Sequence, residues 1–92
     1  KIYCHKNGTY QNSGDPAAGS NGITMSSAYQ DYWTPWMSKD DTTHNAVVDF
    51  NFGNPQFAIS SGNSDANGYG NFEYAVPSGF YAICTKNIAL YG

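Results

Sequence analysis

The chain has 92 residues, the size of one small domain, and a core built from so few residues is thin. Charged residues make up 12% of it and aromatic residues 16%, the opposite of the balance in disordered segments, so we expect a folded chain. Four Lys, no Arg and seven acidic residues give a net charge of −3, which excludes the basic face that nucleic-acid binding requires.

Short β-branched and aromatic runs with turn residues between them recur along the chain, and this pattern predicts an all-β fold. Near the start we expect a hairpin that turns at Asn7-Gly8, since both residue types tolerate the positive φ of a tight turn. Residues 12–22 are predicted to form a loop, because nearly all of them are turn formers. The strands expected in this half are residues 1–5, 9–11, 23–25 and, as an edge or bulged strand containing Pro35, residues 30–38.

The second half contains the clearest strand pattern, over residues 46–52. The apolar side chains of Val48, Phe50 and Phe52 alternate with polar ones, which predicts one buried and one solvated face. No helix is predicted anywhere, and residues 87–92 carry no assignment. Further short strands are expected at residues 57–60, 72–76 and 80–84, with a long loop over 61–70.

Three stretches of the chain carry long, ordered motifs. They are IYCHKNGTYQNSGDPAAG (residues 2–19), DFNFGNPQF (49–57) and GNFEYAVPSGFYAICTKN (70–87). In this order they resemble the C-terminal half of the SPRY domains found in bacteriophage virion proteins, and only the central residues 23–45 fall outside the match. The resemblance implies an antiparallel, concanavalin A-like β-sandwich, with residues 1–92 forming a single SPRY-like β domain or its C-terminal portion.

The chain departs from the family pattern in two ways. Cys4 stands where the family usually has an aromatic residue, so the packing there is expected to differ. A complete SPRY sandwich also needs strands that would precede Lys1. The resemblance therefore implies an incomplete domain, which is either embedded in a longer polypeptide or completed by other copies as a homo-oligomer.

The same resemblance implies a non-enzymatic virion component of a tail fibre, a tail or a capsid surface. Its partners would be other virion proteins, or a glycan or protein of the host surface. The alternative is a secreted, lectin-like carbohydrate-binding module, because concanavalin-type sandwiches also hold sugars. No membrane insertion is expected, since the longest uncharged stretch, residues 50–64, is broken by Gly, Asn and Pro.

The residue patterns that enzymes use are missing from the sequence. Neither His5 nor His44 has a nucleophile-elbow motif or a catalytic-cysteine signature around it. Paired carboxylates for glycoside hydrolysis are also unconvincing, because Asp40 and Asp41 are adjacent in a polar turn and Glu73 stands alone on an expected strand. We therefore expect no catalytic residues and no enzymatic activity.

An aromatic cluster is the main candidate for binding. Its members can form a stacking platform for sugar rings or a protein-interface patch, because Tyr and Trp bury a large area and keep a polar group. The alternative is that the two Trp side chains fill a thin core. The candidate binding residues are Tyr29, Tyr32, Trp33, Trp36 and, outside the cluster, Tyr69.

The loop after residue 62 offers a weak calcium-site candidate. Asn63, Asp65 and Asn67 place oxygen-bearing side chains at alternate positions before a Gly at the sixth, as a calcium loop does. The loop begins with Asn rather than Asp, and Glu73 comes one residue before the twelfth position, where the bidentate Glu belongs. We predict no metal site and no cofactor, and we expect Asx turns to stabilise this loop. Calcium binding by the loop is the alternative.

The two cysteines, Cys4 and Cys84, lie near opposite ends of the sequence. A disulfide between them would close a long loop and stabilise the fold. They are too few for a disulfide framework or for a structural zinc site. The sequence leaves two possibilities: a Cys4–Cys84 disulfide, or two small buried thiols.

Overall fold

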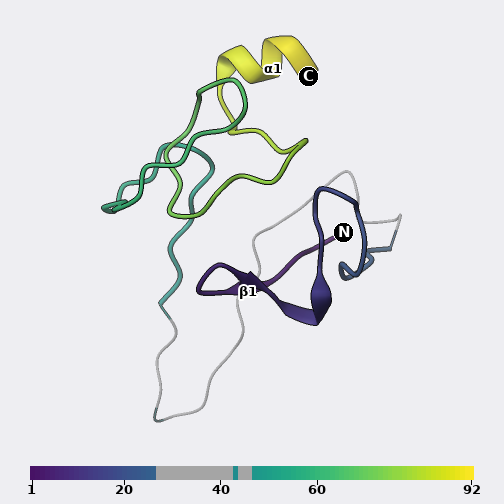
Figure 1. Ribbon diagram of the computed structural model, residues 1–92. Coiled ribbons are helices and arrows are strands. Elements are labelled where there is room, and N and C mark those ends of the chain that lie inside the picture. The colour runs from purple at the N-terminus through teal and green to yellow at the C-terminus, as the bar shows by residue number, and fades with distance from the viewer. Residues whose placement is uncertain (27–42, 44–46) are drawn as a thin grey trace.

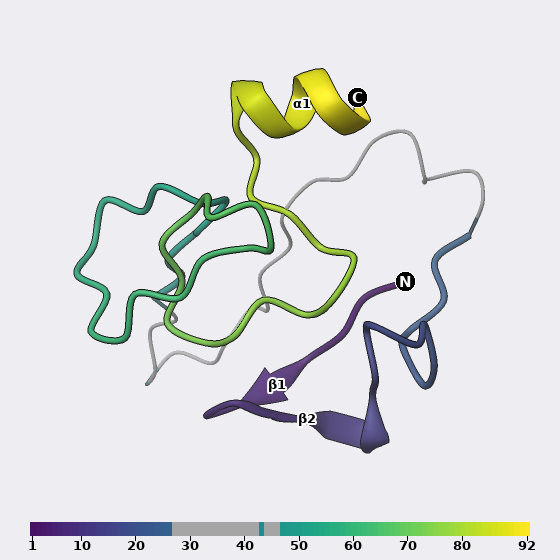
Figure 2. The same cartoon turned by 45° about the horizontal axis from the view of Figure 1, so that its top comes forward.

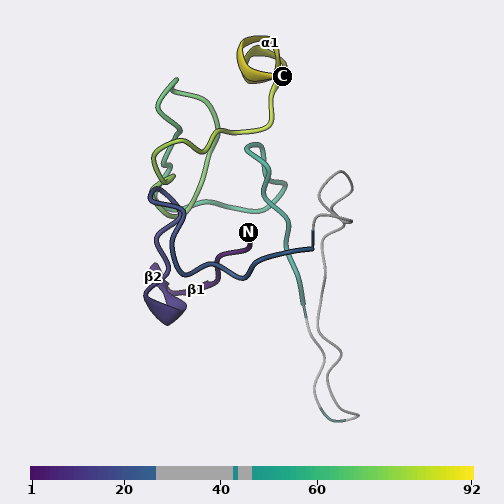
Figure 3. The ribbon, with the colours of Figure 1, turned by 90° about the vertical axis from the view of Figure 1, so that its right-hand side faces the viewer.

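The computed structural model describes residues 1–26, 43 and 47–92. Helix α1 lies at the end of the molecule away from the β1–β2 hairpin, and irregular loops of residues 47–84 lie between them (Figures 1, 2 and 3). The regular elements are β1 (His5–Lys6), β2 (Thr9–Tyr10), the 3-10 turn η1 (Gln11–Ser13) and α1 (Thr85–Tyr91).

The predicted all-β sandwich, SPRY-like or concanavalin-like, is wrong, since the described residues form one two-stranded antiparallel sheet and one helix. In the rest of the described chain, strand pairing is limited to single bridges, which join Ile2 to Ile23, Asp15 to Ser20 and Asn63 to Phe72. The backbone between residues 51 and 80 reverses direction too often for a longer ladder to form. Positive φ occurs in this stretch at Gly53, Gly62, Gly68, Gly70 and Gly79.

The hairpin predicted at Asn7-Gly8 is confirmed. These two residues have φ values of 49° and 87°, and the flanking pairs are His5 with Tyr10 and Lys6 with Thr9. Positive φ at both central positions matches the right-handed twist of the strands, which explains why the two-residue turn closes here. The strands themselves are shorter than the expected residues 1–5 and 9–11.

The sequence prediction of no helix is wrong, because residues 85–91 form helix α1. Cys84 is extended at its N-cap, and the Cys84 Sγ accepts a hydrogen bond from the Asn87 N–H at 3.5 Å. At the other end, the Gly92 N–H donates to the Ile88 carbonyl at 2.8 Å. Helices usually begin after a Ser, Thr, Asp or Asn N-cap, and a cysteine is not one of these residue types. The sequence therefore gives no recognisable sign of where α1 begins. Within the described part of the chain, no helix is long and apolar enough to cross a membrane.

The buried residues of the described chain are few, and two of the four, Asp65 and Asn87, are polar. Ala82, at 3% exposed, is the only buried hydrophobic side chain there, and it lies beside Asp65 (5%) and Asn87 (4%). The predicted buried face of residues 46–52 is wrong, because Phe50 and Phe52 are 50% and 48% exposed. An alternating strand buries its apolar face only against a second layer, and the described residues supply no opposing sheet.

Candidate functional site

A hollow of about 510 Å³ opens between the β1–β2 hairpin and the loops of residues 49–81. Its volume is within the range of small-ligand sites, roughly 300–1,000 Å³. We call it the aromatic hollow. Its aromatic walls come from Phe57, Phe72, Tyr74, Phe80 and Tyr81, and its polar groups from His5, Asp49, Asn51 and Glu73.

Hydrogen bonds around residues 51–53 bring the walls of the hollow together. The Asn51 side-chain amide donates to the Asn71 carbonyl and its Oδ1 accepts from the Gly53 N–H, both at 2.9 Å. On either side, the Asn71 N–H donates to the Gly53 carbonyl at 2.9 Å and the Ile83 N–H to the Phe52 carbonyl at 2.8 Å. These bonds hold residues 51–53 between the segments that carry Phe72 and Tyr81.

The hairpin closes one side of the hollow through ring contacts with Tyr74. The His5 ring meets the Tyr74 ring edge-on, with centroids 4.9 Å apart, and meets Tyr10 in the same way at 5.4 Å. A Cβ added at Gly8 would lie 3.2 Å from the Tyr74 ring, so the hairpin turn packs closely on this side chain. Tyr74 therefore links the hairpin to the rest of the molecule.

Glu73 is a half-buried carboxylate of the hollow that accepts hydrogen bonds from this chain. Its Oε2 accepts from the Ser60 N–H at 2.9 Å, and its Oε1 accepts from the Ser60 hydroxyl. These hydrogen bonds lower the pKa of the Glu73 carboxyl below its ordinary value, so the group is ionised near neutral pH. Asp49, the second carboxylate, is exposed. The described lining residues include Asp49 and Glu73 and no Lys or Arg, so their formal charge is negative.

A second polar cluster, which we call the polar hub, is formed by Asp65, Asn67 and Asn87. The Asp65 Oδ1 accepts from the N–H groups of Asn67 and Tyr69, both at 2.9 Å. Its Oδ2 accepts from the Ala82 N–H at 2.9 Å and the Asn87 side-chain amide at 2.8 Å. Burial acts to raise the pKa of the Asp65 carboxyl, but these donors outweigh it and hold that pKa below its ordinary value.

The polar hub ties three separate segments to one another. The Asn87 side-chain amide also donates to the Ala82 carbonyl at 2.8 Å. The Asn67 side-chain amide donates to the Asn87 Oδ1 at 3.0 Å and to the Tyr91 hydroxyl at 3.1 Å. The loop of residue 65, the segment of residue 82 and helix α1 are therefore joined through side-chain amides.

The calcium-loop candidates have other hydrogen-bond roles in this geometry. Asp65 forms an Asx turn with the Asn67 N–H, and the Asn63 amide donates to the Ser61 hydroxyl at 2.9 Å. Glu73, the proposed fourth ligand, is bound to Ser60 instead of facing the loop. In the part of the chain that the structure describes, no three His, Cys, Asp or Glu side chains lie together as a metal site would require.

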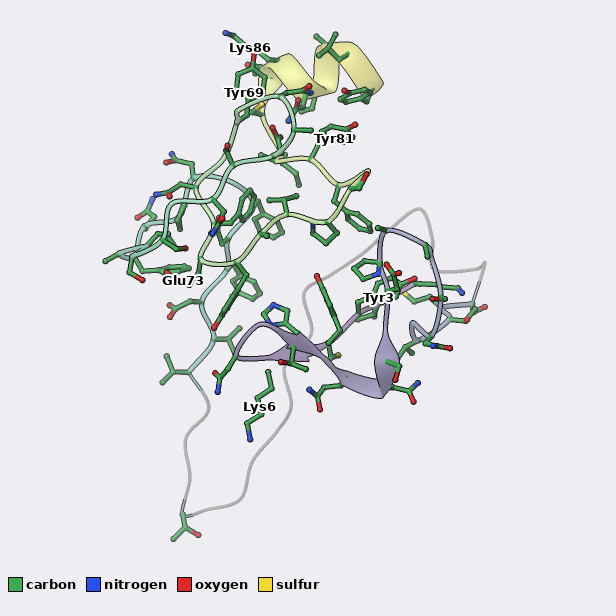
Figure 4. All side chains as sticks on the ribbon, in the orientation of Figure 1. Tyr3, Lys6, Tyr69, Glu73, Tyr81 and Lys86 are labelled. Atoms are coloured by element: carbon green, nitrogen blue, oxygen red, sulfur yellow. The ribbon has the colours of Figure 1, made fainter. Side chains whose placement is uncertain are left out.

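The predicted aromatic cluster, Tyr29, Tyr32, Trp33 and Trp36, lies outside the described residues. Tyr69 lies next to the polar hub rather than in the aromatic hollow. The Lys86 ammonium is 5.4 Å from the centroid of the Tyr69 ring, and Figure 4 shows both side chains near the start of α1, well away from Glu73. Tyr69 is thus placed as a neighbour of the helix, apart from the hollow.

The structure leaves Cys4 and Cys84 as free thiols. The structure therefore has no Cys4–Cys84 disulfide. The two thiols are not both buried either, because Cys4 is exposed and Cys84 is half-buried. Cys84 acts instead as the N-cap of α1.

Sequence reasoning missed most residues of the hollow. Phe72, Tyr74, Phe80 and Tyr81 were expected only as strand residues. The signal that points to them is the density of aromatic side chains on both sides of the Pro77-Ser78-Gly79 turn. For Asn87 the sequence carries no signal, because its role depends on a buried carboxylate 22 positions earlier in the chain.

Comparison of the chain with protein-family models, with curated proteins and with solved structures finds no match in any of the three. The resemblance to SPRY domains stays a prediction made from the motifs.

Proposed function

We propose that this chain is a non-enzymatic binding module that contacts a partner protein through the aromatic hollow. One observation carries the proposal: the concave aromatic walls remain open to solvent, with Tyr74 44% and Phe80 46% exposed. Apolar surface that is exposed and contiguous is typical of interaction sites, because its removal from water drives association. Aromatic side chains are also enriched in the buried centres of protein interfaces.

The titratable groups of the hollow support binding rather than catalysis. The His5 Nδ1 accepts the Gly8 N–H at 3.3 Å, and its ring is held against Tyr10 and Tyr74. Glu73 is ionised and bound to Ser60, which suits it to attract a positive group and not to donate a proton. The location we propose is a virion, in a tail fibre, a tail or a capsid surface, on the support of the SPRY-like motifs alone. A secreted module is the alternative.

The test is an NMR titration of the full chain with the neutral probe N-acetyl-phenylalanine amide. We expect shifts of backbone resonances around Phe72, Tyr74 and Phe80, and their loss in the Phe80→Ala variant. The Ile88→Ala variant removes an exposed apolar side chain from α1, outside the hollow, and keeps the shifts. Shifts that are absent, or that survive Phe80→Ala while the polar-hub resonances show an intact fold, would refute the proposal.

Saccharide binding is the second candidate, because the rings of the hollow stand beside the acceptors Asp49, Asn51 and Glu73. Sugar rings stack on aromatic faces, and their hydroxyls donate to carboxylates and amides. Methyl glycosides in the same titration separate the two. Shifts confined to the glycosides would favour the lectin-like alternative.

A further inference from the structure

Two carboxylates of the described chain, Asp65 and Glu73, have several hydrogen-bond donors but differ in burial. A carboxylate accepts about four hydrogen bonds. Asp65 has four donors on its two oxygens, from Asn67, Tyr69, Ala82 and Asn87. Glu73 accepts from the Ser60 N–H and hydroxyl, and hydrogen bonds from Ser61 also lower the pKa of its carboxyl. Glu73 is only half-buried, unlike Asp65, and it lines the aromatic hollow.

The charge around the hollow is not balanced by the described lysines. Lys6 follows His5 in β1, and adjacent strand residues face opposite sides, so Lys6 points away from the hollow that His5 lines. Figure 4 shows Lys6 extending from the hairpin on the side away from α1. The Lys1 ammonium donates to the Gly19 carbonyl at 2.7 Å, and Lys86 lies over Tyr69.

We infer that the partner segment held by the aromatic hollow carries an Arg or Lys side chain next to its apolar anchor, with Glu73 and Asp49 as the groups that recognise the cation. The inference rests on the proposed function and names the chemistry of its partner. A guanidinium or ammonium donates charge-assisted hydrogen bonds to the Glu73 and Asp49 carboxylates, and such bonds are about twice as strong as neutral ones. The neighbouring rings of Tyr74 and Phe80 add cation–π attraction.

The charge pattern favours this partner over the other classes. An anionic ligand is repelled by both carboxylates and by the net charge of −3. A neutral saccharide can donate its hydroxyls to the carboxylates, but it brings no opposite charge. A cationic peptide gains both apolar contact with the rings and ion pairing with the two carboxylates.

The test compares two capped tripeptides that differ only in charge, Arg-Phe-Arg and citrulline-Phe-citrulline. By NMR titration at low ionic strength, we expect the arginine peptide to bind about tenfold more tightly, with the ratio falling as salt is added. The Glu73→Gln variant should bring the ratio close to one. Asp15→Asn changes the net charge equally but lies outside the hollow, so it should leave the ratio nearly unchanged.

A second variant, Asp49→Asn, tests the same point if Glu73→Gln disturbs the Ser60 segment. It changes an exposed residue and should lower the ratio by a smaller factor. Equal binding of the two tripeptides at the hollow overturns the inference but leaves the proposed function standing. Failure of both peptides and of the neutral phenylalanine probe refutes the proposed function itself, and binding of methyl glycosides alone replaces it with the saccharide alternative.

Discussion

The polar hub and the aromatic hollow differ in how far their polar groups are buried. In the hub, Asp65 and Asn87 are buried and saturated with hydrogen bonds from this chain. In the hollow, aromatic rings stay about half exposed, and Glu73 is half-buried while Asp49 is exposed. A buried polar group with all its partners inside the chain stabilises the fold, while an accessible charge beside exposed apolar surface can meet a ligand.

This difference reverses the usual arrangement of a small domain. The described residues bury an amide and a carboxylate, and they expose most of their large apolar side chains. Buried hydrogen-bonded networks specify one arrangement because breaking a single member leaves the others unpaired. We therefore expect the fold to depend on the hub and the binding to depend on the hollow.

The largest expected effect follows from removing the amide of the hub. Asn87→Ala deletes the donor to Asp65 and to the Ala82 carbonyl, so it should lower the free energy of unfolding by about 2–4 kcal/mol. Urea unfolding followed by circular dichroism measures it. Leu90→Ala, on the exposed side of the same helix, should change the value by no more than about 0.5 kcal/mol. Equal losses in the two variants would remove the hub from its structural role.

A backbone test at Gly70 probes the packing between hub and hollow. Gly70 has φ of 93°, and a Cβ there would lie 2.4 Å from the Phe72 ring and 2.9 Å from the Ala82 Cβ. Gly70→Ala should cost about 2–3 kcal/mol, from the unfavourable φ and the clash together. Gly79→Ala has a similar φ of 86° but nothing within 4 Å, so it should cost about 1 kcal/mol. If the two substitutions lower the free energy of unfolding equally, the close approach of Gly70 to Ala82 does not restrict the residue at position 70.

Acid should weaken the hub and the Glu73 cluster together. The folded-state pKa values of Asp65 and Glu73 lie below their ordinary values of 3.8 and 4.5. The folded state thus binds these protons less tightly than the unfolded chain does, and the stabilisation is complete above those ordinary values and lost as pH falls through the lower folded values.

Two measurements check the acid prediction. The urea midpoint should fall as pH decreases from about 7 to about 2. Carboxyl carbon NMR should place the titration of Asp65 below 3.8. The Glu73→Gln variant should keep the part of the acid loss that comes from Asp65. A carboxyl of Asp65 that titrates at or above its ordinary value would contradict the hydrogen-bond pattern of the hub.

The parts of the molecule that follow from local chemistry were predictable from the sequence. The Asn7-Gly8 turn is an example, because positive φ at two adjacent residues is encoded by the residue types themselves. The alternation of Val48, Phe50 and Phe52 predicted a buried face, but burial depends on an opposing layer that the pattern cannot supply. Helix α1 escaped prediction because it is short, capped by a thiol and anchored by Asn87 to a distant carboxylate.

The candidate site was predicted even less completely than the fold. From the sequence, Glu73 was considered as a lone carboxylate and as a weak calcium ligand, and its hydrogen-bond partner Ser60 lies 13 residues earlier in the chain. The hollow needs several loops to meet around Asn51, and such long-range contacts have no local signature. Aromatic density near residues 72–81 is visible in the sequence, but it does not separate core from interface.

The smallest expected effect on stability is that of a substitution in the hollow. It tests directly whether the hollow serves binding while the hub serves stability. Phe80 is 46% exposed, so Phe80→Ala removes far fewer contacts than truncation of a core phenylalanine, which typically costs about 3–5 kcal/mol. We expect a loss of about 1 kcal/mol or less in urea unfolding, together with the loss of phenylalanine-probe binding. A loss as large as that of Asn87→Ala would mean that the hollow is part of the core. A small loss of stability together with abolished binding would mean that the rings of the hollow serve a partner. The polar hub would then stabilise the fold that presents them.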